Sequence, residues 1–110
     1  MDNINTADTI NNLGITYQNQ GKYYEAITQY QRALRIYEKA FGVDHINIAG
    51  TIMNIGLLFK RQGQTKLSRT HLLRGYQIFK SNLGELHPHT QKALSILENR
   101  WEDDSKEGSE

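Results

Sequence analysis

The side chains in this sequence that are best suited to chemistry are not arranged as catalysis or metal binding would require. His87 and His89 form an H-x-H pair, but no third ligand lies near them in the sequence, and a metal site needs three or four ligands. Gly21 and Lys22 lack the earlier glycines and the following Ser or Thr of a phosphate-binding loop. No Ser-His-acid or paired-carboxylate arrangement is suggested, and there is no cysteine. We therefore expect no catalysis, no cofactor and no metal.

The composition narrows the class of protein. The chain has 110 residues and a net charge of +1, so we expect one domain without an overall field toward nucleic acid or membrane. The N-terminal residues MDNINTADTI are polar and acidic, unlike a signal peptide. No apolar run is long enough to span a membrane. We expect a cytoplasmic protein that makes no membrane contact.

The elements that must position any site come from an internal repeat. When the sequence is shifted by 42 residues, many residues coincide with identical ones. The matching pairs include Ile10 and Ile52, Asn12 and Asn54, Gly14 and Gly56, Gly21 and Gly63, Gly42 and Gly84, and His45 and His87. A repeat of this length indicates stacked supersecondary units.

Each repeat unit is predicted to be a helical hairpin. Ile10, Leu13 and Tyr17 are spaced i, i+3, i+7, so they share one face of a first helix. Gly21 marks a tight turn, and Gly42 ends a second amphipathic helix. We predict helices over residues 6–20, 23–41, 47–62, 65–83 and 89–102.

The small residues and the loops support this reading. Glycine inside a helix costs about 0.5–1 kcal/mol relative to alanine, so Gly14 requires a packing reason. We expect Gly14 to face Ala26 across the first hairpin and to let the two helices approach closely. In the loops, Asn47 is a candidate N-cap, and the recurring His45 and His87 are expected to set the loop conformation.

The pattern resembles the tetratricopeptide repeat. The consensus of that family has a large apolar residue, Leu-Gly three and four positions later, an aromatic, and then a small residue, an aromatic and a small residue on the second helix. The matching residues are Ile10, Leu13, Gly14, Tyr17, Ala26, Tyr30 and Ala33 in the first unit, and Ile52, Ile55, Gly56, Phe59, Ser68, Leu72 and Gly75 in the second. The 42-residue interval and the loops FGVDHINI and LGELHPHT are similar to the kinesin-light-chain-like subtype.

The resemblance covers about residues 3–101 and implies an all-α fold. It implies a right-handed α-α superhelix, a solenoid of two helix-turn-helix repeats plus a C-terminal capping helix. We assign residues 3–102 to this domain and residues 103–110 to an acidic disordered tail. Trp101 aligns with Tyr17 and Phe59, so it is expected in the core.

The resemblance also implies a binding groove, because similar proteins bind peptides or partner helices on the concave face lined by the first helix of each repeat. The candidate peptide-binding residues are those not used in packing: Asn11, Asn12, Ile15, Asn19, Met53, Asn54, Leu57 and Arg61. Asn12 and Asn54 share one repeat position, where the family's asparagines hydrogen-bond a peptide backbone, for which an amide offers both donor and acceptor. The alternative is that both are solvated helix residues.

Two further surfaces are candidates for binding. A carboxylate clamp of this family would need five polar residues, of which only Asn54 and Lys92 match, with Asn11, Ile15 and Ile96 in place of the rest. A basic stripe on the fourth helix comprises Lys66, Arg69, Arg74 and Lys80. It could receive an acidic partner or a phosphate backbone, although a solvated outer face is the commoner case. Nucleic acid is not expected, because no aromatic residues interleave with the stripe.

We therefore predict a non-catalytic interaction module that binds a protein or peptide partner on the concave face. The alternative is a self-assembling structural piece, either a homo-oligomer or a segment of a longer array. That alternative follows because repeat proteins need about three or more units for stability, and this chain has two and a half.

Overall fold

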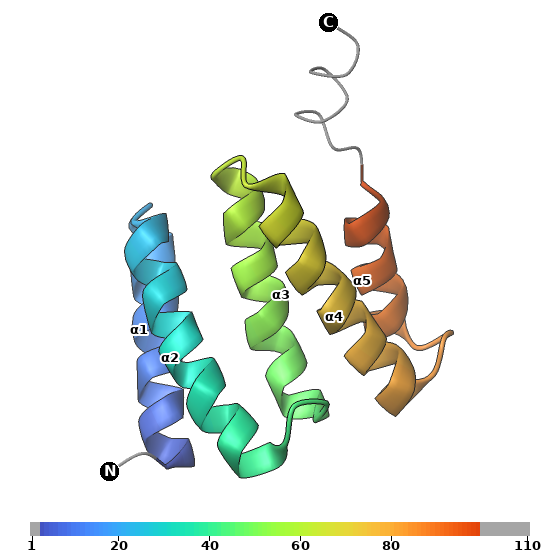
Figure 1. The fold of residues 1–110 in the computed structure, drawn as a ribbon, viewed down its shortest axis with the longest axis horizontal. Helices are drawn as coiled ribbons and strands as arrows, with labels where there is room; N and C mark the ends of the chain where they lie inside the picture. Colours follow the sequence, from blue (N-terminus) through green and yellow to red (C-terminus); the bar gives the residue numbers. More distant parts are fainter. Residues whose placement is uncertain (1–2, 100–110) are drawn as a thin grey trace, which may run out of the picture.

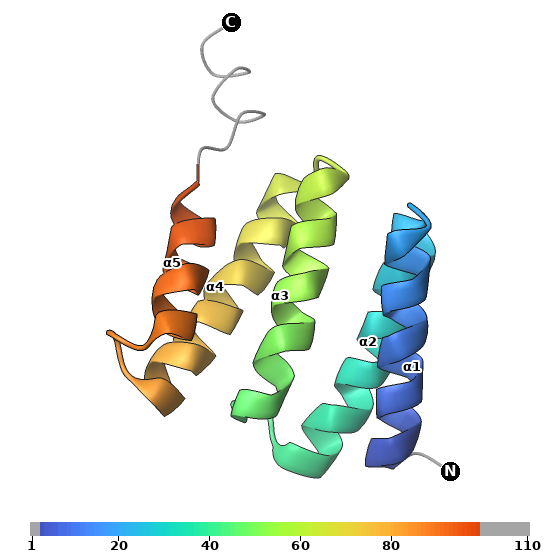
Figure 2. The ribbon, with the colours of Figure 1, turned by 180° about the vertical axis from the view of Figure 1, so that it is seen from behind.

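The computed structural model describes residues 3–99, and this part of the chain is all-α, as predicted. The helices are α1 (Ile4–Asn19), α2 (Tyr23–Phe41), α3 (Ile46–Arg61), α4 (Thr65–Leu83) and α5 (Pro88–Glu98). α1 packs on α2, and α3 packs on α4, as two helical hairpins, and α5 packs on α4 (Figure 1). Seen from behind, α1, α3 and α5 form one layer in front of α2 and α4 (Figure 2). The fifth helix was predicted over residues 89–102, but α5 begins at Pro88 and ends at Glu98, with Asn99 as its C-cap. Trp101 and the acidic tail lie outside the described residues.

The ends of α2 and α4 are set by glycine. Gly42 has a φ of 97° and Gly84 a φ of 93°, a left-handed conformation that residues with a Cβ rarely adopt. The Gly42 N–H donates to the carbonyl of Glu38 at 2.8 Å, and the Gly84 N–H donates to that of Lys80 at 3.0 Å. Each bond satisfies one of the carbonyls left free at a helix C-terminus.

Histidine, and not asparagine, caps the helices that follow these glycines. The His45 Nδ1 accepts from the backbone N–H of Asn47 at 3.1 Å, and the His87 Nδ1 accepts from that of His89 at 3.0 Å. The prediction of Asn47 as N-cap is therefore wrong, and α3 begins one residue earlier than predicted, at Ile46. The H-x-H pair has the same explanation, since His87 is a cap of α5. Among residues 3–99 no group of three or more His, Asp or Glu could hold a metal ion.

In the first hairpin, the residue that packs against the glycine of α1 is larger than the sequence suggested. A Cβ on Gly14 would lie 2.8 Å from the ring of Tyr30, so Tyr30, rather than Ala26, faces this glycine. Tyr30 is fully buried, which raises the pKa of its phenol, and its hydroxyl donates to the side-chain oxygen of Gln18 at 2.7 Å. The glycine thus makes room for an aromatic ring that fills the centre of the hairpin.

The second hairpin has a leucine and a serine where the first has a tyrosine and an alanine. Leu72 takes the place of the tyrosine, and it would lie 2.8 Å from a Cβ on Gly56. The Ser68 hydroxyl donates to the Gly56 carbonyl at 2.6 Å, and both Ser68 and Leu72 are fully buried. Leu72 and Ser68 thus both lie against the backbone of α3 at Gly56.

Burial along the first helix departs from the predicted stripe. Ile10 is buried, but Leu13 is 40% exposed, whereas the matching Ile55 in the second repeat is fully buried. The reason is that α2 packs against α3, whereas no helix in residues 3–99 covers the corresponding side of α1. Two further positions of that side carry threonine, Thr6 and Thr16, where α3 has the fully buried Ile48 and Leu58.

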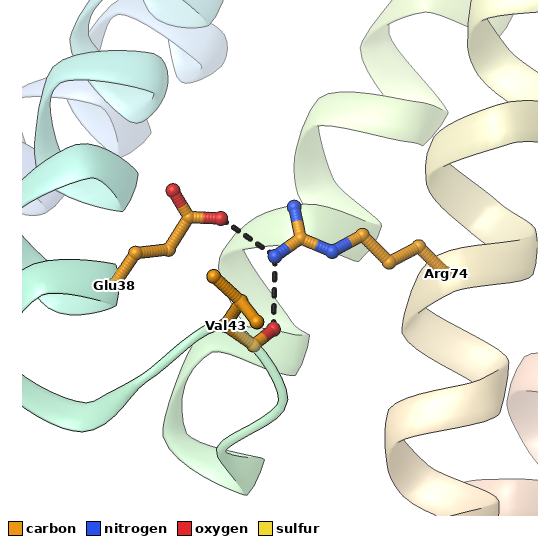
Figure 3. Close-up of polar contacts among 3 residues, drawn as sticks. All are labelled: Glu38, Val43 and Arg74. Atoms are coloured by element: carbon orange, nitrogen blue, oxygen red, sulfur yellow. Dashed lines mark hydrogen bonds and ion pairs between the residues drawn. The ribbon is translucent and has the colours of Figure 1, made fainter.

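A polar contact joins the two repeats. The Arg74 guanidinium donates to the carboxylate of Glu38 at 2.6 Å and to the carbonyl of Val43 at 2.9 Å (Figure 3). The arginine lies on α4, the glutamate near the end of α2, and Val43 in the turn that follows. The two charged side chains are 33% and 26% exposed, so solvent screens the pair only in part.

We expect Arg74→Ala to lower the free energy of unfolding by about 1 kcal/mol, because one change removes both bonds of a partly exposed pair. Arg32→Ala is the matched control, since Arg32 holds the same position in the first repeat and has no carboxylate partner in residues 3–99. Urea unfolding of both variants and of Glu38→Ala measures the effect. An equal loss of stability in Arg74→Ala and Arg32→Ala would show that the contact of Arg74 with Glu38 and Val43 adds nothing to the free energy of unfolding.

Candidate functional site

The two asparagines that share a repeat position lie on the layer of α1, α3 and α5. Asn12 on α1 is exposed, and Asn54 on α3 is partly buried. Among residues 3–99, neither side-chain amide has a hydrogen-bond partner; only the backbone carbonyl of Asn12 is used, by the hydroxyl of Thr16. Both amides therefore have their donors and acceptor free for a bound chain.

A cavity of about 200 Å³ lies beside Asn54, between α3 and α5. Its wall is mainly apolar, with Asn54, His89 and Lys92 as the polar members. The lining residues are Gly50, Met53, Asn54, Leu57, Phe79, His89, Lys92, Ala93 and Ile96. A concave apolar cavity with a few polar groups is the usual form of a ligand site.

Beside this cavity the second repeat lacks a contact that the first repeat has. In the first repeat the Tyr37 hydroxyl donates to the carboxylate of Asp8, which joins α2 to α1. Burial, and then this carboxylate, raise the pKa of Tyr37. In the second repeat, Gly50 stands in the position of Asp8 and Phe79 in that of Tyr37. A Cβ on Gly50 would meet no atom within 4 Å, so the space is left open.

Two of the predicted groove residues line this cavity from α3. Met53 is only 7% exposed, because its thioether packs over Gly75, where a Cβ would lie 2.5 Å from the sulfur. Leu57 is partly buried beside it. Met53 is therefore a floor of the cavity rather than a free groove side chain.

The remaining predicted groove residues are spread along the layer. Asn11 lies at the seam between two helices, where its side-chain oxygen accepts from the hydroxyl of Thr51 at 3.1 Å. Arg61 lies over the ring of Tyr23, with its guanidinium carbon 5.7 Å from the ring centre. Ile15 is 39% exposed on α1. Asn19 is an exposed residue at the end of the same helix.

The structure adds residues that sequence reasoning did not place in a groove. Phe79, His89 and Ala93 line the cavity from α4 and α5. Gly50 was missed as well, although the sequence carries a signal, because a side chain present at Asp8 is absent at the matching position. The sequence pattern suggests Lys92 only for a carboxylate clamp, whereas in the structure it lines the same cavity as Asn54.

Cations of the basic stripe predicted on α4 contact other groups of the same chain. Arg74 is bound to Glu38 and to the carbonyl of Val43. The Lys80 ammonium lies 5.9 Å from the centre of the Tyr76 ring, a cation–π distance. Lys66 and Arg69 are exposed on the first half of the helix. At Arg74 the acidic partner is the chain's own glutamate.

One family of known proteins matches this chain over both hairpins. Residues 5–81 match the family model described as tetratricopeptide repeat. The match takes in α1 to α3 and nearly all of α4, and thus both hairpins. A search of curated proteins returned no match. No helix in residues 3–99 is both long and apolar enough to cross a membrane.

Proposed function

The chain belongs to the tetratricopeptide repeat family, whose repeats generally mediate contacts between proteins, and we propose that it is a non-catalytic interaction module for an extended peptide. The peptide lies on the layer of α1, α3 and α5. The cavity beside Asn54 takes one of its side chains. The observation that carries this proposal is the open cavity next to an amide that has no partner in residues 3–99.

The chemistry of the cavity defines the class of peptide. Met53, Leu57 and Ala93 supply an apolar wall, which favours one large apolar side chain. Asn54 borders the same space, and its amide can both donate to and accept from a peptide backbone. Lys92 is an exposed cation at the cavity, which favours an acidic neighbour of the apolar residue. The ligand is thus an extended segment with a large apolar residue next to an Asp or Glu.

The first test combines Asn12→Ala with Asn54→Ala. Peptides are selected on the wild-type chain from a random displayed library, and the affinity of the best ones is then measured for the double variant. We expect an affinity loss of about tenfold or more, because two backbone hydrogen bonds disappear, with the unfolding midpoint nearly unchanged.

The control for this experiment is Gln77→Ala, which removes an exposed amide from α4 in the other layer. We expect it to leave both affinity and stability unchanged. Equal binding by the double variant and by wild type would contradict the proposal that the asparagines hold the peptide.

Two finer assignments rest on the sequence. The 42-residue interval, together with the glycine ends of α2 and α4 and the histidine caps of α3 and α5, supports the kinesin-light-chain-like subtype. A cytoplasmic location stays a prediction.

A further inference from the structure

A second concave site lies on the side of the first repeat that faces away from the second repeat. It is a cavity of about 550 Å³ between α1 and α2. Thr6 and Ile10 line it from α1, and Arg32, Arg35, Ile36 and Lys39 line it from α2. Among residues 3–99, no acidic residue lines this cavity. The cavity therefore combines an apolar floor with three cations.

The second repeat shows what such a surface accepts. The positions that match Ile10, Arg32 and Ile36 are occupied by Ile52, Arg74 and Ile78. Both of these isoleucines are buried in the core that the two repeats share. Arg74 binds the carboxylate of Glu38 and the carbonyl of Val43. In the second repeat this surface thus packs against the end of a helix and the turn after it.

The matching arginine of the first repeat lacks these contacts. Arg32 donates to the side-chain oxygen of Gln29 at 2.6 Å, and no carboxylate contacts it in residues 3–99. Arg35 and Lys39 have no ion pair in the same part of the chain. We propose that this surface binds the C-terminal end of an acidic helix of another protein. A carboxylate one turn before the end of that helix meets Arg32, and the carbonyl of the following turn meets the same guanidinium.

The charge of this surface indicates a partner that is more acidic than the helix end that packs on the second repeat. Arg35 and Lys39 correspond to Gln77 and Ser81 in the second repeat, so the outer surface has two more cations than the internal seam. A second copy of this chain fits poorly, because in each copy the Glu38 carboxylate and the Val43 carbonyl at the end of α2 already bind Arg74. The α4 residue that corresponds to Glu38 is Lys80, which would bring a cation against the arginine. The partner therefore carries more than one acid near its helix end.

The test uses as a probe the segment of this chain that packs between the two repeats. A peptide with the sequence of residues 23–45 contains the helix and turn that bind Arg74, and a staple between positions 24 and 28 keeps it helical on an exposed side. Circular dichroism confirms the helix before use. Binding to the full chain is measured by fluorescence anisotropy. We expect saturable binding that Arg32→Glu weakens about tenfold or more, since it sets two carboxylates opposite each other.

Charge reversal makes the result specific. A peptide with Glu38→Arg is expected to bind wild type poorly and to regain affinity for the Arg32→Glu chain. Wild-type and Arg32→Glu chains that bind the probe equally, or a helical probe that does not bind at all, would overturn the proposal. Self-association of the chain that Arg32→Glu abolishes, measured by light scattering over a range of concentrations, would also overturn it and assign the surface to a second copy.

The two proposed sites are separable in the same experiment. Gly50→Phe fills the cavity beside Asn54 and is expected to leave binding of the stapled probe unchanged. Amide shifts on titration with the probe are expected at Ile10 and Arg32, not at Asn54. Shifts confined to the cavity between α3 and α5 would show that the probe occupies the peptide site, which would contradict a second surface.

Discussion

Gly56→Ala is expected to lower the free energy of unfolding by about 1–3 kcal/mol, because the added methyl group overpacks the second hairpin. Its Cβ would lie 2.8 Å from the Cγ of Leu72 and 3.2 Å from the backbone nitrogen of the same residue. Leu72 is fully buried, so neither its branch point nor its backbone can give way without moving α4. The loss is measured as the shift in urea midpoint at constant slope.

Gly50→Ala is the matched control on the same helix and has the opposite expected sign. Gly50 is exposed, and a Cβ there meets nothing within 4 Å. Alanine at this position only removes the entropic cost of glycine in a helix, so we expect a gain of about 0.5–1 kcal/mol. If the two substitutions changed stability by the same amount, close helix packing would not be the reason for Gly56.

Gly50→Phe is expected to abolish peptide binding without loss of stability. The new ring starts from a Cβ in open space and extends into the cavity of about 200 Å³ between α3 and α5. It would occupy the volume that we assign to the apolar side chain of the peptide. Library-selected peptides are titrated against Gly50→Phe, Gly50→Ala and wild type, and the unfolding midpoint of each protein is measured in parallel.

The comparison with Gly50→Ala separates filling of the cavity from a change in helix propensity. The alanine variant leaves most of the space open, so its affinity is expected to stay close to that of wild type. Retained binding in a folded Gly50→Phe protein would place the peptide elsewhere on the layer. Neither result affects the stapled-probe experiment, which concerns the cavity between α1 and α2.

Much of the fold could be predicted from local and periodic signals. The 42-residue repeat, the helical hairpins and the turns at the recurring glycines follow from residue spacing alone. Gly42 and Gly84 end helices because their backbone conformation is one that a Cβ disfavours. The helix starts were harder to predict, since histidine ranks below asparagine as a capping residue in general, yet His45 and His87 make the caps.

The candidate site was predicted less well, because its properties depend on residues far apart in the sequence. Asn12 and Asn54 were proposed from their repetition, and in residues 3–99 both lie on the layer of α1, α3 and α5 without a hydrogen bond to the side-chain amide. Met53 was expected in the open groove, but the missing side chain of Gly75 lets it sink into the core. Arg74 was expected on a basic stripe that could receive an acidic partner, and it is paired with a glutamate of the preceding hairpin of the same chain.

The sequence by itself determined which units form, because helix periodicity and turn chemistry act over a few residues. The tertiary structure decided which side of each unit stays open. Leu13 and Ile55 occupy the same repeat position, yet one is exposed and the other buried, because in residues 3–99 a preceding hairpin packs against α3 and none packs against α1. In the same way Arg32 and Arg74 share a position, and among residues 3–99 a carboxylate contacts Arg74 but not Arg32. Identical local patterns acquire different roles because burial and pairing depend on neighbours that the stacking of the repeats supplies.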